Sequence, residues 1–143
     1  MGRELCACAK GSYGKGVVEK RKILIIDDSE ITLAMEKAVL EARGYQVEAT
    51  STLLEFESTL RRWRPDLILT DIHMPGIKGT DLCRTLKNQY GTQDIPIVLF
   101  STLPDNELAK LADQVGADGF ISKANGLDAL GERVDDLVES ILW

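Results

Sequence analysis

The stretch Ile23-Leu24-Ile25-Ile26-Asp27-Asp28 consists of four branched aliphatic residues followed by two carboxylates. A nearly continuous apolar run of this kind is typical of a strand in a parallel sheet that helices cover on both faces. Four more short apolar runs follow along the chain, at residues 46–49, 67–69, 95–100 and 119–121. The second of these five runs alternates in polarity, as an edge strand does. The sequence therefore predicts five strands.

The segments between these runs have the spacing of amphipathic helices. Three of them carry apolar stripes: Ile31, Met35, Ala38 and Ala42; Leu108, Leu111, Ala112 and Val115; and Leu127, Leu130, Val134, Leu137 and Ile141. Boundary signals agree, since Thr52 and Glu55 form a capping box and Pro104 suits a first helical turn. Left-handed residues that would end helices are expected at three glycines: Gly44, Gly91 and Gly116. Five strand–helix units joined by short turns predict an α/β domain with one parallel sheet and helices on both faces.

The length of 143 residues is that of one domain, or of one domain with a short arm. The formal net charge of −6 argues against nucleic-acid binding by the protein as a whole, because nucleic-acid binders are usually basic. Residues 1–22 hold six basic and two acidic side chains, whereas the other 121 residues hold 11 basic and 21 acidic ones. No stretch approaches 18 consecutive apolar residues, so no transmembrane helix is expected.

Residues 1–20 lack sustained periodicity, so we expect a flexible basic arm in front of a domain at residues 21–143. The glycines of this arm do not fit the spacing of a phosphate-binding loop. Cys6 and Cys8 could bind a metal ion, but no second pair of ligands accompanies them. Three cysteines, an odd number, do not make a disulfide framework and favour a reducing compartment, the cytoplasm.

Polar residues end or follow four of the predicted strands: Asp27 and Asp28, Asp71, Ser101 and Thr102, and Lys123. In open parallel sheets the functional crevice lies outside the carboxyl ends of the strands, so we expect these side chains to converge there. Three aspartates repel one another unless a cation is present, and oxygen ligands of high negative charge favour a hard cation such as Mg²⁺. A carboxylate can attack phosphorus and form an aspartyl phosphate, while Mg²⁺ and a lysine neutralise the transferred group.

Four motifs stand in order along residues 22–143: Ile25-Ile26-Asp27-Asp28-Ser29, Leu67-Ile68-Leu69-Thr70-Asp71-Ile72-His73-Met74-Pro75-Gly76-Ile77-Lys78-Gly79, Phe100-Ser101-Thr102, and Gly116-Ala117-Asp118-Gly119-Phe120-Ile121-Ser122-Lys123. With these motifs the chain resembles the receiver domain of bacterial response regulators, in particular its single-domain, chemotaxis-regulator-like members. The resemblance implies a flavodoxin-like (βα)5 three-layer sandwich with a five-stranded parallel sheet of order 2-1-3-4-5.

The resemblance also implies the roles of the acidic residues. Asp71 is expected to be the phosphoacceptor. The implied cofactor is Mg²⁺, bound directly by Asp28, Asp71 and the backbone carbonyl of His73, with Asp27 holding the water shell of the ion.

Three further residues have roles implied by the resemblance. Ser101 is expected to bond the phosphoryl group and to move the loop after the fourth strand, and Lys123 to pair first with the carboxylate and then with a phosphoryl oxygen. Phe120 stands at the aromatic switch position, although an aromatic residue in a buried strand is usually core packing. The sequence departs from the family pattern at Ala124, where proline is common, and at Thr102, where a small residue is common.

The chain ends at Trp143, directly after the last predicted helix, so we expect a single-domain response regulator of a two-component or phosphorelay system. A histidine kinase or phosphotransfer protein would phosphorylate Asp71 and thereby change the binding of a downstream protein to the face made by the fourth helix, the fifth strand and the fifth helix. We expect a cytoplasmic monomer or weak phosphorylation-dependent dimer. We expect neither direct nucleic-acid binding nor membrane insertion, and no enzymatic activity beyond self-catalysed phosphorylation and dephosphorylation.

Two other functions fit parts of the pattern. The first is an interaction module with receiver architecture that signals without phosphorylation, and the intact set of Asp27, Asp28, Asp71, Ser101 and Lys123 speaks against it. The second is a phosphatase with an aspartyl nucleophile. That class uses Asp-x-Asp, whereas here His73 stands two positions after Asp71, where the second aspartate would be.

Overall fold

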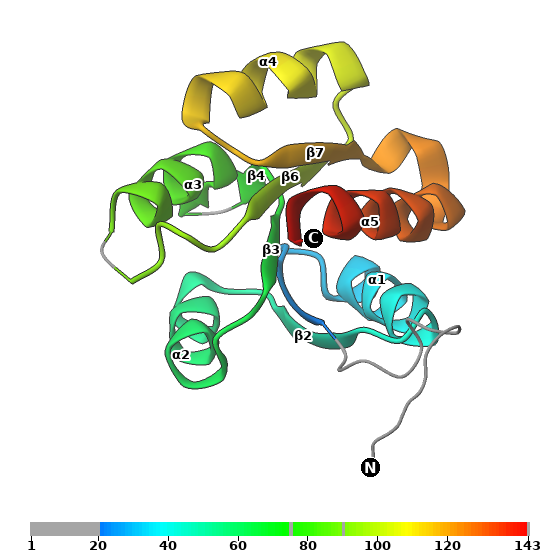
Figure 1. The fold of residues 1–143 in the computed structure, drawn as a ribbon, viewed down its shortest axis with the longest axis horizontal. Coiled ribbons are helices and arrows are strands. Elements are labelled where there is room, and N and C mark those ends of the chain that lie inside the picture. Colours follow the sequence, from blue (N-terminus) through cyan, green and yellow to red (C-terminus); the bar gives the residue numbers. More distant parts are fainter. Residues whose placement is uncertain (1–20, 75, 90, 143) are drawn as a thin grey trace.

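The computed structural model describes residues 21–142, apart from 75 and 90 (Figure 1). Five strands form one parallel sheet of order β2-β1-β3-β6-β7. They are β1 (Lys22–Ile26), β2 (Gln46–Thr50), β3 (Leu67–Thr70), β6 (Ile97–Ser101) and β7 (Gly119–Ser122). Counted along the chain without the two short strands β4 and β5, this is the order 2-1-3-4-5, so the predicted flavodoxin-like fold is confirmed. The predicted arm at 1–20, with Cys6 and Cys8, lies outside the described residues.

Helices cover both faces of the sheet, as the strand composition predicted (Figure 1). The helices are α1 (Glu30–Ala42), α2 (Leu53–Trp63), α3 (Gly79–Asn88), α4 (Asp105–Val115) and α5 (Gly126–Leu142), with a short 3₁₀ helix, η2 (Lys123–Asn125). Successive side chains of a strand point to opposite faces, so Leu24 and Ile26 pack beneath α2, α3 and α4 while Ile23 and Ile25 pack beneath α1 and α5. None of the helices in the described part of the chain is long and apolar enough to cross a membrane.

The helix ends follow the local signals in the sequence. Thr52 caps α2 by accepting a hydrogen bond from the Glu55 N–H at 3.1 Å, and the Glu55 carboxylate accepts from the Ser51 N–H at 3.0 Å. Gly116 ends α4 with a φ of 77°, in the predicted left-handed conformation. Pro104 stands one residue earlier than predicted, at the N-cap of α4.

The predicted apolar stripe of α1 is wrong. Ile31 is 77% exposed and Met35 is 46% exposed, and the two alanines of that stripe are exposed as well. The helix instead turns Leu33, Glu36 and Leu40 toward the protein. Both sets of residues have helical spacing, so the periodicity does not decide between them; Leu33 and Leu40 are the ones that pack in the cluster formed with the sheet and α5.

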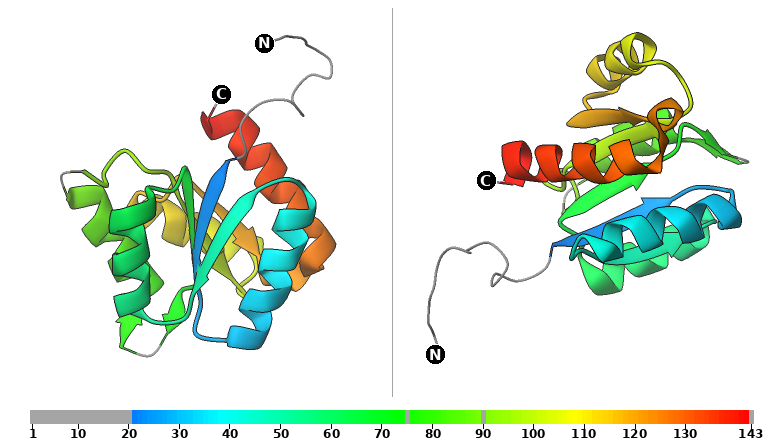
Figure 2. Two further views of the ribbon diagram at one scale, coloured as in Figure 1. Left: turned by 90° about the horizontal axis from the view of Figure 1, so that it is seen from below. Right: turned by 90° about the vertical axis from the view of Figure 1, so that its right-hand side faces the viewer.

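A short hairpin that the sequence analysis did not predict follows β3. It consists of β4 (His73–Met74) and β5 (Ile77–Lys78), which pair antiparallel, with Gly76 between them at a φ of 88°. Two-residue strands carry no readable periodicity, so only the turn residues of this motif signal them. Figure 2 shows the hairpin at the same edge of the sheet as the start of α1, which is the edge where the strands end.

Candidate functional site

Three carboxylates meet at the carboxyl edge of the sheet. Asp27 and Asp28 directly follow β1, and Asp71 directly follows β3. The strands β1 and β3 are hydrogen-bonded neighbours in the sheet. One carboxylate oxygen from each residue lies within 4.8 Å of the other two. Asp27 is 2% exposed and Asp71 is 9% exposed, whereas Asp28 is exposed, so the cluster opens to solvent on the Asp28 side. The strand topology thus brings together residues that are more than 40 positions apart in the sequence.

Asp71 is held by the backbone around it. One of its carboxylate oxygens accepts a hydrogen bond from the Ile72 N–H at 2.9 Å, and its carbonyl accepts from the Thr70 hydroxyl at 3.0 Å. A Cβ atom added to Gly79 would lie 1.8 Å from the Asp71 carbonyl oxygen, so only glycine allows α3 to begin this close to it. Burial raises the pKa of the Asp71 carboxyl above its ordinary value, and the charges of Asp27 and Asp28 add to the rise.

Lys123 brings a positive charge to the same cluster. It follows β7, and its ammonium donates a hydrogen bond to a carboxylate oxygen of Asp27. The Nζ atom also lies 3.8 Å from an Asp71 oxygen and 4.9 Å from the centre of the Phe100 ring. Burial acts to lower the pKa of Lys123, but the hydrogen bond to Asp27 and the surrounding carboxylates outweigh it and raise the pKa. The lysine therefore stays charged at neutral pH.

A fourth carboxylate, Glu36, stands beside Lys123 and was missed by the sequence analysis. It is 1% exposed, and one of its oxygens lies 3.9 Å from the Lys123 Nζ atom. Neither oxygen has a hydrogen-bond partner among the described residues. Burial raises the pKa of Glu36 from 4.5 to about 8, although the charge of Lys123 opposes the rise. The signal in the sequence was a lone glutamate between Leu33 and Leu40 on one face of the helix.

Ser101 ends β6 and is buried, while Thr102 after it is exposed. The Ser101 hydroxyl accepts a hydrogen bond from the Leu103 N–H at 3.4 Å. Ser122, which pairs with Ser101 in the sheet register, is also buried and was not among the predicted site residues.

Phe120 and His73 make contacts with residues outside the acidic cluster. Phe120 is half-buried on β7, with the Arg133 guanidinium 5.8 Å from its ring centre and donating to its carbonyl at 3.2 Å. His73 lies on β4 with an exposed side chain, where its backbone pairs with Lys78.

The donor set fits a hard divalent cation. Asp27, Asp28 and Asp71 provide oxygen ligands only, and Lys123 neutralises only part of their charge. Like charges this close raise the free energy of the folded state, and a cation bound through one or two carboxylates and several waters relieves it. Mg²⁺ is such a cation, and it also accepts phosphate oxygens.

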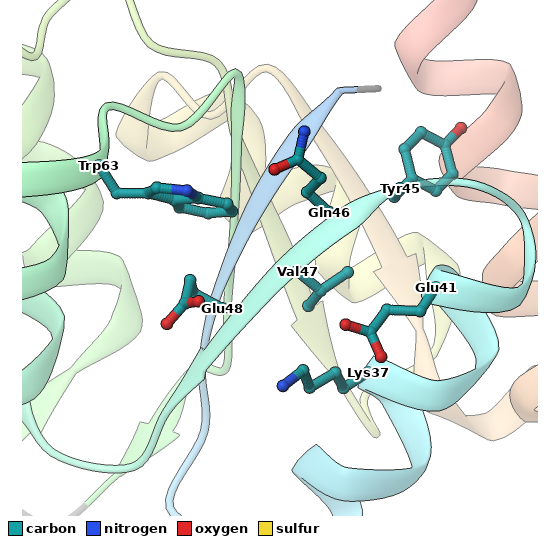
Figure 3. Close-up of a pocket in the computed structure, with 7 residues that line it drawn as sticks. All are labelled: Lys37, Glu41, Tyr45, Gln46, Val47, Glu48 and Trp63. Carbon is teal, nitrogen blue, oxygen red and sulfur yellow. The ribbon is translucent and has the colours of Figure 1, made fainter. Parts of the chain in front are cut away.

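A cleft of about 400 Å³ adjoins the cluster on its open side. Its lining comes from the carboxyl edge of the sheet and the starts of α1 and α2: Ile26, Asp28, Glu30, Ser51, Thr52, Leu53 and Met74. A second pocket, of about 350 Å³, lies over the edge strand β2 between Lys37, Tyr45 and Trp63 (Figure 3). No member of the acidic cluster lines this second pocket, so the cleft beside Asp28 is the relevant approach to the cluster.

Comparisons with known proteins point to one family. A sequence model of the response regulator receiver domain matches residues 23–135. The chain is 32% identical over 120 residues to a gliding motility regulatory protein of Myxococcus xanthus, an alignment that covers 83% of this chain and 15% of that protein. It is 29% identical over 103 residues to the polar-differentiation response regulator DivK of Brucella anthropi, covering 72% of this chain and 84% of DivK.

Solved structures agree with these sequence matches. The signal receiver domain of a signal transduction histidine kinase from Syntrophus aciditrophicus is 36% identical, with a TM-score of 0.72, over 85% of this chain and 92% of that chain. The chain spans less than half of the length of several curated relatives that it matches, so what it has in common with them is one domain of a larger protein.

Proposed function

Because the chain belongs to the response regulator receiver domain family, we propose that it signals in a two-component or phosphorelay system by accepting a phosphoryl group on Asp71. The observation that supports this most directly is the cluster of Asp27, Asp28 and Asp71 with the Lys123 ammonium among them. We propose residues 21–143 as the extent of the receiver domain and residues 1–20 as a flexible basic arm.

In the proposed reaction, a carboxylate oxygen of Asp71 attacks the phosphorus atom of a phosphohistidine or a small phosphodonor. The bond between phosphorus and the donor breaks, its electron pair stays with the donor, and an aspartyl phosphate forms. Asp28, Asp71 and the His73 carbonyl would hold Mg²⁺, and Asp27 its water shell. When bound, the ion supplies positive charge to the transferred group. Lys123, already 3.8 Å from an Asp71 oxygen, supplies the second positive charge.

Ser101 and Phe120 carry the proposed response to phosphorylation. The buried Ser101 hydroxyl now accepts from the Leu103 N–H, and a bond to the phosphoryl group would compete with this contact and shift the loop before α4. Phe120 is only half-buried, so a move inward beneath that loop would bury more of its ring. Converting a two-state equilibrium from 1:99 to 99:1 takes about 5.5 kcal/mol, which a few charge-assisted hydrogen bonds can supply.

The proposed partners are proteins. A histidine kinase or phosphotransfer protein would donate the phosphoryl group, and a downstream protein would bind the face formed by α4, β7 and α5. We propose a monomer or weak phosphorylation-dependent dimer that acts in the cytoplasm and does not bind nucleic acid directly. The only chemistry proposed is its own phosphorylation and dephosphorylation.

The test is incorporation of phosphate from acetyl phosphate in the presence of Mg²⁺, followed by intact-protein mass spectrometry. The wild-type chain should gain one phosphoryl group and the Asp71→Asn variant none. Asp81→Asn, which removes an exposed carboxylate from α3, is the matched control and should be modified like the wild type. Incorporation by the Asp71→Asn variant at the wild-type level would show that Asp71 is not the acceptor.

A second experiment, partner binding, decides between the proposal and an interaction module that signals without phosphorylation. Such a module would bind its partner equally well with and without Mg²⁺ and beryllofluoride, whereas the proposed function requires a difference. An aspartyl phosphatase would release phosphate continuously from phosphomonoesters, and we expect no such turnover because His73 replaces the acid–base aspartate of that class.

A further inference from the structure

The hydroxyl of Ser122 makes two hydrogen bonds that join separate segments of the carboxyl edge. It donates to the Leu103 carbonyl at 2.8 Å, in the loop between β6 and α4. It also accepts from the Ala124 N–H at 3.2 Å, in the turn η2 that carries Lys123. Ser122 is 3% exposed, so water cannot readily replace either bond if the hydroxyl is lost.

The Leu103 peptide connects this hydroxyl to Ser101. The Leu103 N–H donates to the Ser101 hydroxyl at 3.4 Å, while the Leu103 carbonyl accepts from Ser122. The two serines are register partners on the adjacent strands β6 and β7. The Leu103 peptide therefore links the Ser101 hydroxyl, through Ser122, to the backbone of the turn that carries Lys123.

The departure of this chain from the family pattern at position 124 is part of the same arrangement. Ala124 has the N–H that Ser122 accepts from, and a proline at that position would have none. In this chain a side-chain hydrogen bond at the N-cap of η2 fixes the start of the turn. Ser122 thus holds the turn at the residue directly before Lys123.

We infer that Ser122 is a positioning residue that couples the Ser101 loop to the Lys123 turn, so that the two groups proposed to contact the phosphoryl group keep a fixed relative position. This inference rests on the proposed function of Asp71, since Ser122 acts through Ser101 and Lys123 and does not touch the reacting atoms. Positioning of catalytic groups contributes to the rate only while their geometry is maintained.

The test compares Ser122→Ala, Ser122→Thr and the control Ser140→Ala, which removes an exposed hydroxyl that also donates to a backbone carbonyl. At saturating Mg²⁺, Ser122→Ala should be phosphorylated by acetyl phosphate about 5- to 10-fold more slowly than the wild type, because the loss of both hydrogen bonds loosens the turn that positions Lys123. Ser122→Thr, which keeps the hydroxyl, should recover the wild-type rate, and Ser140→Ala should not change it.

A purely structural role is distinguished by the affinity for Mg²⁺, measured separately by titration. Coupling predicts a slower rate without a loss of Mg²⁺ affinity, because a loosened Lys123 turn leaves the three carboxylates in place and removes part of a positive charge that opposes the ion. General damage to the site would weaken both. A wild-type rate in Ser122→Ala, or a parallel loss of Mg²⁺ affinity, would overturn the inference.

Amide hydrogen exchange without any phosphodonor separates this inference from the proposed function. The Ala124 amide should exchange at least about tenfold faster in Ser122→Ala than in the wild type, while the Leu99 amide within β6 keeps its protection. If the Ala124 amide exchanges faster in Ser122→Ala but the wild-type chain takes up no phosphate, the proposed function is refuted and the role of Ser122 stands. If the Ala124 amide exchanges at the same rate in both chains, the role of Ser122 is refuted, whatever the phosphorylation result.

Discussion

Replacing the buried Glu36 by glutamine should change how the stability of the protein depends on pH. Glu36 is 1% exposed, has no hydrogen-bond partner among the described residues and lies 3.9 Å from the Lys123 ammonium. Burial raises its pKa from 4.5 to about 8, so the folded state disfavours the ionised form. Glu36→Gln removes the ionisable group while keeping the size of the side chain.

Because the pKa of Glu36 is raised in the folded state, the protein should become less stable as the pH rises. A carboxyl whose pKa is higher in the folded state penalises folding only where the unfolded chain has lost the proton. The penalty is therefore absent below about pH 4.5, grows as the pH rises and is complete above about pH 8. Each pH unit in this interval costs about 1.4 kcal/mol, which gives an upper limit of about 5 kcal/mol. Small rearrangements relieve part of this cost, so we expect about 2–4 kcal/mol.

The assay is urea denaturation of the wild type and Glu36→Gln between about pH 5 and about pH 8.5. The free energy of unfolding of the wild type should fall relative to that of the variant by about 2–4 kcal/mol as the pH rises through this range. Glu41→Gln removes an exposed charge from the same helix and should follow the wild-type curve. If the curves of the wild type and Glu36→Gln run parallel, Glu36 is ionised and solvated in the folded protein, and the reasoning is refuted.

Three further predictions concern the same edge of the sheet. Lys123→Met leaves the buried Asp27 carboxylate without its partner and should lower the free energy of unfolding by about 3–5 kcal/mol at neutral pH; a loss below about 1 kcal/mol in urea denaturation would contradict the pairing. Gly79→Ala places a Cβ atom 1.8 Å from the Asp71 carbonyl oxygen, so it should lower the free energy of unfolding by at least about 1–3 kcal/mol and slow phosphorylation. A wild-type melting temperature of this variant would show that the backbone of Gly79 does not lie this close to the Asp71 carbonyl. Mg²⁺ at about ten times its dissociation constant should add about 1.4 kcal/mol to the stability of the wild type and less to Asp71→Asn, as thermal melts with and without EDTA would show; an equal gain in both would place the ion elsewhere.

The parallel sheet and the acidic cluster were predictable because they follow from the alternation of strands and helices along the chain. Asp27, Asp28, Asp71 and Lys123 each stand within two residues of the end of an apolar run, and parallel strands end at one edge. Their convergence therefore needed no knowledge of side-chain packing. The sheet order came from the family resemblance, and the observed register agrees with it.

Glu36 was not predictable in the same way because the face of α1 was misassigned. The stripe that begins at Ile31 and the one that contains Leu33 and Leu40 both have helical spacing. Packing against α5 and the sheet decides between them, and packing is not encoded in the periodicity of one helix. Once the wrong face was chosen, Glu36 fell on the predicted exposed side.

Ser122 was missed for another reason. A serine at the end of a strand is an ordinary capping or turn residue, and nothing near it in the sequence indicates that Leu103 lies opposite. The contact spans 19 positions and exists because β6 and β7 are neighbours whose following loops return over the same edge. The hairpin β4–β5 was not predicted because strands of two residues are too short to show alternation of polar and apolar residues.

The central claim, that the phosphoryl group is carried by Asp71, is tested most directly by finding the modified residue. The chain is treated with acetyl phosphate and Mg²⁺ and then reduced with borohydride, which converts an aspartyl phosphate to homoserine, and the peptides are sequenced by mass spectrometry. The account predicts homoserine at position 71 and at no other aspartate. Phosphate found instead on His73 or Ser101, or no modification under conditions that phosphorylate a known receiver domain, would contradict it.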